Sequence, residues 1–215
     1  KTLRVPRALA AKITLKGAPL MFNETLWALG MAGVMQNYSV RGLSVVAGLN
    51  ISTTISNLFY VVYMALGSSV AIIVGQLLGA GKMEEAKSMV KKMQIFSVSS
   101  CIGIAVIMSL LAPIFPQIYN TGEEVKQLAA KFIIISALVM PLGAFASTCY
   151  FTLRTGGQTM ITFLFDGIYT WAVNIPLAYC LVRMTDLHIL PIYFICQFSE
   201  IIKCMIGYVL VKKGI

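Results

Sequence analysis

The longest uncharged stretch of the chain, residues 45–78, restricts the fold more than any other feature of the sequence. As a single α-helix it would extend roughly 50 Å at 1.5 Å per residue, which exceeds the ~30 Å hydrocarbon core of a bilayer. Two short tilted helices are the alternative, but Gly67 and the two serines after it lie too close to the end of the stretch to separate them well. We therefore expect one long, bent helix that crosses a membrane and projects beyond it.

The composition places the rest of the chain in the same environment. Hydrophobic residues make up 58% of the 215 residues and charged residues 12%, and the mean hydropathy is +0.83. A typical soluble domain has about 25% charged residues. So little polar surface excludes both a soluble monomer and a disordered chain. We expect an all-α, polytopic membrane protein.

The apolar stretches are long enough for six spans that together form one transmembrane lobe, residues 18–215. Short charged or glycine-containing segments separate them, and prolines inside two of them predict kinks. The predicted spans cover approximately residues 18–38, 45–78, 93–118, 125–153, 159–182 and 189–211.

The first 17 residues have a different pattern, in which basic side chains are spaced among leucine, valine and isoleucine. This pattern predicts a basic amphipathic segment, residues 1–17, that lies on the membrane surface. The chain begins at Lys1 and not at a methionine, so we expect a fragment or a trimmed product.

The lysines and arginines are distributed unequally over the two sides of the predicted lobe. Four of them, Arg41, Lys126, Lys131 and Arg183, fall on the side opposite the termini. The side with the termini has Lys1, Arg4, Arg7, Lys12, Lys16, Lys82, Lys87, Lys91, Lys92, Arg154, Lys212 and Lys213. Since cytoplasmic loops are enriched in basic residues, we expect both termini on the cytoplasmic side of the plasma membrane.

The net charge of +9 does not indicate a nucleic-acid partner, because the basic residues lie between apolar stretches and are better explained by topology and anionic lipids. The five cysteines lie in apolar stretches without metal-ligand spacing. The sequence also shows no nucleophile paired with a base, and no glycine-rich loop that could bind phosphate. We expect membrane lipids as partners, no nucleic acid, no metal, no cofactor and no enzymatic activity.

Apart from Lys126 and Lys131 near the start of the fourth span, four ionisable residues fall inside the predicted spans, where an ionised group is costly and is by default a candidate for function. Glu24 has no basic residue within helical reach, so it is a candidate to bind a cation or a proton; snorkelling or capping of the helix start is the alternative. Asp166 has either a structural or a cavity role. Glu200 and Lys203 are spaced i, i+3, which favours a structural ion pair.

Polar residues in the second and fifth spans predict a cavity. The second span carries five at intervals of three or four, and therefore on one helix face: Asn50, Thr53, Thr54, Asn57 and Tyr60. The fifth span contributes Tyr169, which lies about one turn after Asp166, and Asn174, which lies near a backbone carbonyl that Pro176 can free. Hydrogen bonds between neighbouring helices are the alternative use of these side chains.

Several segments resemble the second half of a bacterial multidrug and toxic compound extrusion (MATE) transporter. They are MFNETLWALG at residues 21–30, VGQLLGAGKMEEA at 74–86, LRTGGQT at 153–159 and DGIYTWAVNIPLAY at 166–179. The GQ..GAG....A pattern after a long helix is fairly specific to this family and its relatives, and the order of the segments matches over nearly the whole chain.

The resemblance implies twelve helices in two six-helix lobes, alternating access, and drug efflux driven by entry of Na⁺ or H⁺. The chain would supply the second lobe, residues 1–17 would connect the lobes, and the partners would be the missing N-terminal lobe and a cationic, drug-like substrate. Glu24 matches a glutamate of the family's seventh helix that binds the coupling cation in some branches. Some branches also have an aspartate in the tenth helix, whereas residues 133–149 here have no carboxylate. Coupling would then use Glu24, Asp166 or aspartates of the first lobe.

Two other functions are compatible with the same pattern. One is a lipid-linked oligosaccharide flippase of the same superfamily, which a more positive, arginine-lined cavity would favour. The other is a self-contained six-helix bundle or channel.

Overall fold

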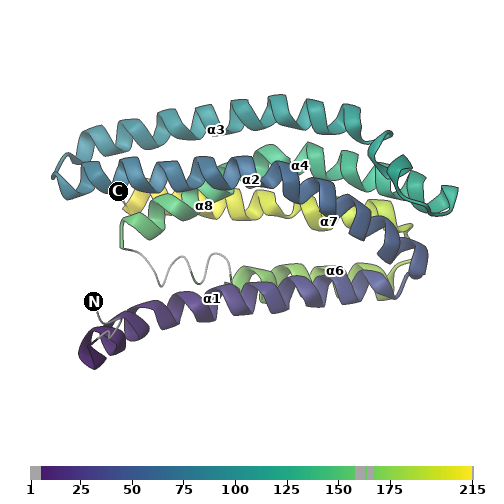
Figure 1. Ribbon diagram of the computed structural model, residues 1–215, viewed down its shortest axis with the longest axis horizontal. Helices are drawn as coiled ribbons and strands as arrows, with labels where there is room; N and C mark the ends of the chain where they lie inside the picture. The colour runs from purple at the N-terminus through teal and green to yellow at the C-terminus, as the bar shows by residue number, and fades with distance from the viewer. Residues whose placement is uncertain (1–5, 158–162, 164–166, 215) are drawn as a thin grey trace.

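The computed structural model describes residues 6–157, 163 and 167–214, and all regular elements in these residues are helical. Long helices lie approximately parallel, and the N- and C-terminal ends of the chain lie at the same end of the bundle (Figure 1). The elements are α1 (Arg7–Ser39), α2 (Leu43–Gly79), α3 (Met83–Leu111), η1 (Phe115–Ile118), α4 (Glu123–Thr155), η3 (Thr170–Asn174), α6 (Ile175–Met184), α7 (Ile189–Phe198) and α8 (Glu200–Gly214).

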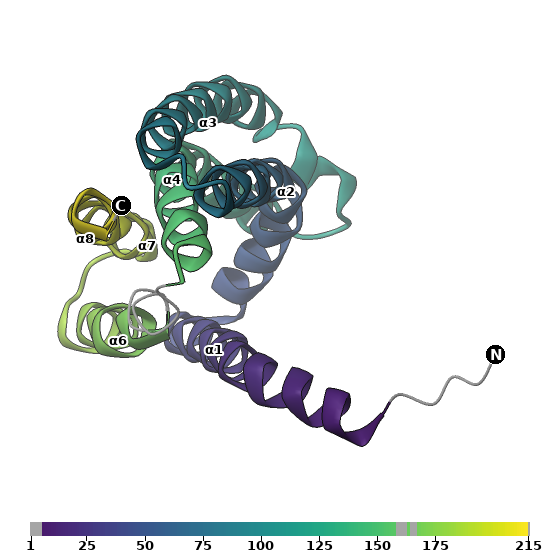
Figure 2. The ribbon, with the colours of Figure 1, turned by 90° about the vertical axis from the view of Figure 1, so that its left-hand side faces the viewer.

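The helices form two groups when the bundle is viewed along its axis (Figure 2). Helix α4 lies at the centre of the larger group, between α2 and α3 on one side and α7 and α8 on the other. The smaller group consists of α1 and α6, which pack against each other. Fully buried side chains such as Phe132, Ile133 and Met140 come from α4, and this helix has more buried residues than any other described helix.

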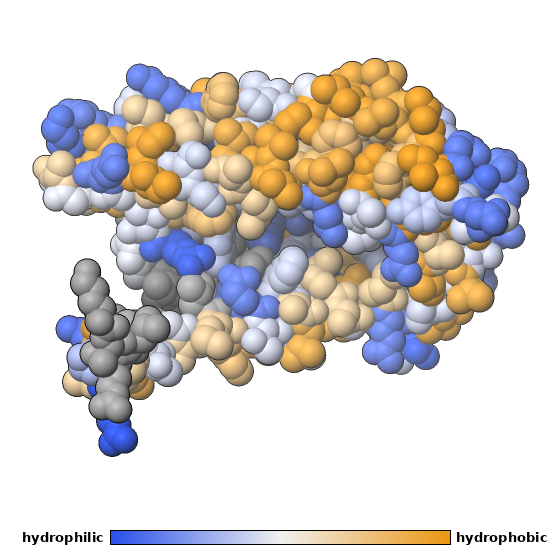
Figure 3. Space-filling model, viewed as in Figure 1, coloured by the Kyte–Doolittle hydropathy of each residue, from blue (hydrophilic) through white to orange (hydrophobic). Residues whose placement is uncertain are grey.

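Within the described residues, four helical segments are long and apolar enough to cross a membrane: α2, α3, α4 and Ile189–Lys212, which combines α7 and α8. Large apolar side chains are exposed on the outside of the bundle, among them Ile95, Phe96 and Val106 of α3. Figure 3 shows this apolar surface over the upper part of the molecule, with hydrophilic side chains gathered at the two ends. The protein is therefore an all-α, polytopic membrane protein.

The long uncharged stretch forms one helix, α2, which bends towards its start (Figure 1). Close packing against α4 depends on Gly67, because a Cβ atom there would lie 2.5 Å from Cδ2 of Phe151. Prediction and structure agree on a single long helix at this position.

The first helix differs from the predicted boundaries, because α1 begins at Arg7 and continues without a break past residue 17. Residues 7–17 contain alanine, leucine, lysine and arginine, which all favour helix, so the amphipathic segment and the first predicted span join into one helix. Glu24 consequently lies near the middle of α1 and not near its start.

The predicted third and sixth spans are both interrupted. Pro113 has no N–H to continue the helical hydrogen bonds, so α3 ends at Leu111, and η1 follows after a short turn. In the sixth span, the backbone carbonyl of Ser199 accepts bonds from Ile202 N at 2.9 Å and from the hydroxyl of Tyr169, which separates α7 from α8. The polar Ser199 therefore ends α7 within an apolar sequence.

The described part of the predicted fifth span contains a π-helical turn, η3, followed by α6. Pro176 lies in the first turn of α6 and has no N–H to bond the carbonyl four residues earlier, which falls within η3. The widened turn accommodates this missing bond. In contrast, α4 continues through Pro141.

Candidate functional site

A cavity lies between the two groups of helices. Its larger part has a volume of about 370 Å³ and is bordered by α1, α2, α4, η3, α7 and α8. A smaller part of about 200 Å³ extends along α1 and α4. Both parts share six lining residues, Trp27, Tyr63, Met64, Gly143, Glu200 and Lys203, so we treat them as one space, the central cavity. Figure 3 shows hydrophilic side chains beside the hollow between α1 and the helices above it.

Helix α2 gives the central cavity a polar wall. Thr53, Asn57 and Tyr60 line it together with Ser56 and Tyr63. The other two members of the predicted polar stripe, Asn50 and Thr54, are exposed but do not line it. The Thr54 hydroxyl donates to the backbone carbonyl of Asn50 at 2.9 Å. The structure therefore brings three of the five predicted residues to the cavity and adds two that the sequence interpretation missed.

The two predicted residues of the fifth span have different positions. Asn174 lines the central cavity, and its amide oxygen accepts a bond from the Ser199 hydroxyl at 3.1 Å. Tyr169 is buried, with 6% of its surface exposed, and its hydroxyl donates to the backbone carbonyl of Ser199 at 2.6 Å. Tyr169 therefore joins two helices and does not line the cavity. Asp166 lies outside the described residues.

Glu24 lines the smaller part of the central cavity from α1, and its side chain is exposed. Glu200 and Lys203, one turn apart on α8, line both parts. Their spacing favours a structural pair, and the structure places both on the wall that Glu24 also borders. Lys203 Nζ lies 6.0 Å from the ring centroid of Tyr169, at the limit of a cation–π contact. Three of the four candidate ionisable residues in the predicted spans thus face one space.

A hydrogen-bonded group of neutral side chains closes another wall of the central cavity. The hydroxyl groups of Ser136 and Tyr193 lie 2.9 Å apart, and Gln197 Nε2 donates to the Tyr193 hydroxyl at 2.9 Å. All three residues line the cavity. The sequence interpretation missed them, although the spacing of Tyr193, Gln197 and Glu200 along one apolar stretch was a usable signal.

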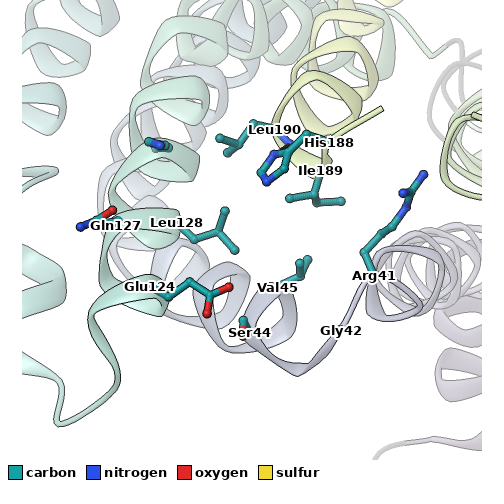
Figure 4. Close-up of a pocket in the computed structure, with 11 residues that line it drawn as sticks. Arg41, Gly42, Ser44, Val45, Glu124, Gln127, Leu128, His188, Ile189 and Leu190 are labelled. Carbon is teal, nitrogen blue, oxygen red and sulfur yellow. Dashed lines mark hydrogen bonds between the residues drawn. The ribbon is translucent and has the colours of Figure 1, made fainter. Parts of the chain in front are cut away.

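A second pocket, of about 350 Å³, lies at the end of the bundle away from the termini. Figure 4 shows it between the start of α4, the start of α7 and the turn from α1 to α2. Its polar lining includes Arg41, Glu124, Gln127 and His188. The His188 imidazole caps α7 by accepting from Leu190 N at 3.4 Å, and Arg41 Nη2 donates to the carbonyl of Thr185 at 2.6 Å. The first contact caps α7 and the second joins the α1–α2 turn to the end of α6, so both have a structural role.

The described residues contain no group of three or more histidine, cysteine, aspartate or glutamate side chains placed to hold a metal ion. The chemistry available in the central cavity is therefore that of two carboxylates, one ammonium group, aromatic rings, hydroxyl groups and amides. Such a lining suits reversible binding of cations with apolar surface.

Known proteins resemble the chain in sequence and in fold. A model of the MatE family matches residues 19–180. The chain is 26% identical over 177 residues to the probable multidrug resistance protein NorM of Bacillus cereus (strain ATCC 10987 / NRS 248), a match that covers 79% of this chain and 37% of that protein. It is 29% identical over 143 residues to the multidrug resistance protein PmpM of Pseudomonas aeruginosa, covering 66% of this chain and 30% of that protein.

The fold resembles that of a solved structure, the Vibrio cholerae MATE transporter VcmN in the bent form, with a TM-score of 0.84 and 16% identity. The match covers 99% of this chain and 48% of that one. The chain therefore has the fold of about half of that structure. It also spans less than half the length of the curated relatives that it matches.

Proposed function

The chain belongs to the MatE family, and from this premise we propose that it is the C-terminal lobe of a transporter that exports drugs or other xenobiotics. Export would proceed by alternating access and would be coupled to entry of Na⁺ or H⁺. The observation that carries the proposal is the position of Glu24, a carboxylate halfway along α1 that borders a cavity with polar and aromatic walls. The relatives that support a role in drug efflux are named for multidrug resistance.

A second six-helix lobe completes the transport path in this proposal. The VcmN structure is about twice as long as the part that this chain matches, which supports a second lobe. Thr53 and Asn57 are exposed on α2 although this helix is one of the candidate membrane spans. Polar side chains at membrane depth generally face protein or water. A second lobe would cover this side of the central cavity.

Glu24 is the proposed site of ion coupling. Ionisable residues within membrane segments generally face protein or a water-filled cavity and mark ion pathways, which fits a carboxylate that binds Na⁺ or H⁺. The exposed side chain lies on the cavity wall, where an ion arriving through water reaches it. Asp166 remains a second candidate for the same role.

The proposed substrate is a monovalent organic cation with aromatic or aliphatic surface. Trp27, Tyr60 and Tyr63 line the central cavity, and aromatic faces attract organic cations. Met31, Met64 and Met140 also line it, and the flexible thioether side chain adapts to ligands of different shape. Among the described lining residues, Lys203 is the one basic side chain, which supports a cationic drug over an anionic, lipid-linked oligosaccharide.

The proposed orientation places both termini and the α2–α3 turn in the cytoplasm. The lysine and arginine side chains of the described residues at this end include Lys82, Lys87, Lys91 and Lys92, which suit the anionic cytoplasmic leaflet. The exposed apolar side chains of α3 would contact membrane lipids.

The test is Glu24→Gln in the complete transporter, reconstituted in liposomes. The amide keeps the size and hydrogen-bonding capacity of the carboxyl group but removes its charge. We expect protein that folds and inserts normally, while drug efflux no longer responds to an imposed Na⁺ or H⁺ gradient. Asp166→Asn is measured in parallel to separate the two candidates.

Glu123→Gln, at the exposed start of α4, is a matched control that removes a carboxylate outside the central cavity. It should leave coupled efflux unchanged. If Glu24→Gln keeps the coupling of the unmodified transporter while Asp166→Asn loses it, the coupling site belongs to the fifth span and the assignment of Glu24 is wrong.

A further inference from the structure

We infer that Glu200 is a second carboxylate of the coupling site and that Lys203 is an internal cation that balances one of the two carboxylates. This inference rests on the proposed function of Glu24. It deepens that function, because it gives the central cavity a charge that one monovalent cation neutralises.

The first observation is that three helices bring these groups to one place. Glu24 comes from α1, and Glu200 and Lys203 come from α8. All three border the smaller part of the central cavity, together with Tyr63 of α2. Trp27, one turn after Glu24 on α1, lines the same part. An ion in this space therefore lies within the field of both carboxylates.

The second observation is the contact between Glu200 and α4. Glu200 Oε2 lies 3.4 Å from the position that a Cβ atom at Gly143 would occupy, and the Tyr63 hydroxyl lies 3.8 Å from the same point. The carboxylate and the phenol thus converge on a surface of α4 that lacks a side chain. Residues 133–149 of α4 contain no carboxylate of their own. The negative charge at this wall therefore comes from α8.

The third observation concerns the cost of these charges. A structural ion pair in a low-dielectric region is often no more stabilising than apolar residues of similar size. Glu200 and Lys203 lie on the cavity wall, beside polar groups and not within an apolar contact between helices. The Lys203 ammonium group also lies 6.0 Å from the ring centroid of Tyr169, at the limit of a cation–π contact. The position favours a role in ion binding.

The charges then define what the cavity accepts. Among the described residues that line it, the ionic side chains are Glu24, Glu200 and Lys203, and the remaining titratable ones are the tyrosines at positions 60, 63, 150 and 193. With the three ionic groups charged, the cavity has a net charge of −1. One coupling cation or one monovalent cationic drug makes it neutral, whereas both together leave an excess positive charge in a low-dielectric site. Mutual exclusion of the two ligands is what exchange requires.

The experiment uses three variants of the complete transporter in liposomes and measures the half-saturating concentration of the coupling cation for drug efflux. Glu200→Gln should raise this concentration about tenfold, because one attractive charge is lost. Lys203→Gln should lower it by a similar factor, because a competing positive charge is lost. The double variant Glu200→Gln/Lys203→Gln restores the net charge and should fall between them. Na⁺ and H⁺ are varied separately to identify the cation.

Lys212→Gln removes a lysine near the end of the same helix, outside the central cavity, and is the matched control. A purely structural pair gives a different result: both single variants lose thermal stability and the half-saturating concentration does not move. That result would overturn the inference. If Glu200→Gln fails to fold, Lys203→Gln alone decides, because the inference requires tighter cation binding.

Glu24→Gln, measured in the same series, separates this inference from the proposed function. Loss of coupling in Glu24→Gln with unchanged cation dependence in both α8 variants contradicts the role of Glu200 and leaves that of Glu24 intact. Retained coupling in Glu24→Gln contradicts the assignment of Glu24 as the coupling site, on which this inference rests. Opposite shifts in the two α8 variants support the inference.

Discussion

The hydroxyl of Tyr169 donates a hydrogen bond of 2.6 Å to the backbone carbonyl of Ser199. Tyr169 directly precedes the π-helical turn η3, and Ser199 separates α7 from α8, so the bond joins the irregular points of two helical segments. Asn174 strengthens the junction by accepting from the Ser199 hydroxyl. Backbone groups released by a helix break at membrane depth need such partners, since lipid offers none.

Tyr169→Phe removes this bond and leaves the carbonyl with one partner fewer. We expect a loss of stability of about 0.5–1.5 kcal/mol, the usual net contribution of one hydrogen bond, because Ile202 N still donates to the carbonyl. The measurement is the thermal unfolding midpoint of the complete transporter in detergent. Tyr208→Phe, at an exposed tyrosine of α8, should leave the midpoint unchanged. Equal midpoints for the two variants would show that the junction contributes little.

Gly67→Ala tests the contact between α2 and α4. The added methyl group would lie 2.5 Å from Phe151 Cδ2 and 2.8 Å from Ser147 Oγ, so the helices must move apart. We expect destabilisation of about 1–3 kcal/mol, the usual effect of overpacking. Gly79→Ala, where an added Cβ has no neighbour within 4 Å, should be neutral or slightly stabilising. A smaller side chain at Phe151 should rescue Gly67→Ala; absence of rescue would argue against this contact as the cause.

Single cysteines at Lys82 and Asp186 test the orientation. The two residues lie at opposite ends of the bundle, Lys82 in the α2–α3 turn and Asp186 between α6 and α7. In a background without the five native cysteines, an impermeant maleimide added outside intact cells should label Asp186→Cys and not Lys82→Cys. The reverse labelling would show that the termini lie outside the cytoplasm.

The chain produced by itself should not confer drug resistance on an efflux-deficient host. The proposed path runs between two lobes, and one lobe leaves the polar wall of α2 without its partner. Resistance is measured as growth at increasing drug concentration, with membrane insertion verified in the same cells. Resistance conferred by residues 1–215 alone would instead support a self-contained bundle that pairs with itself.

The helical membrane fold was predictable because the hydropathy of a segment depends on its own residues and not on the elements that pack against it. The stretch at residues 45–78 became α2, and the long apolar stretches became α3, α4 and the combined span of α7 and α8. Helix ends were less predictable. Nothing in residues 7–17 indicated whether they continue into the next helix, and the end of α7 depends on a bond from Tyr169, 30 residues earlier in the chain.

The polar wall of α2 shows what residue spacing can predict about a site and what it cannot. Intervals of three and four place Asn50, Thr53, Thr54, Asn57 and Tyr60 near one another on a helix, but they do not fix which part of that face meets α4 and α8. Helix packing turned Thr53, Asn57 and Tyr60 towards the cavity and left Asn50 and Thr54 outside it. In the same way, helix packing buried Tyr169 at its junction with Ser199.

Residue types and their order along the chain were enough to place Glu24, Glu200 and Lys203 in apolar stretches, because charge and hydropathy are local properties. The same information showed that Glu200 and Lys203 are spaced i, i+3. The packing of the helices brings these three side chains to one cavity, although α1 and α8 are more than 150 residues apart in sequence. A site forms where side chains from different helices lie within reach of one another. The distances between the helices depend on how they pack around α4 and not on any local pattern in the sequence.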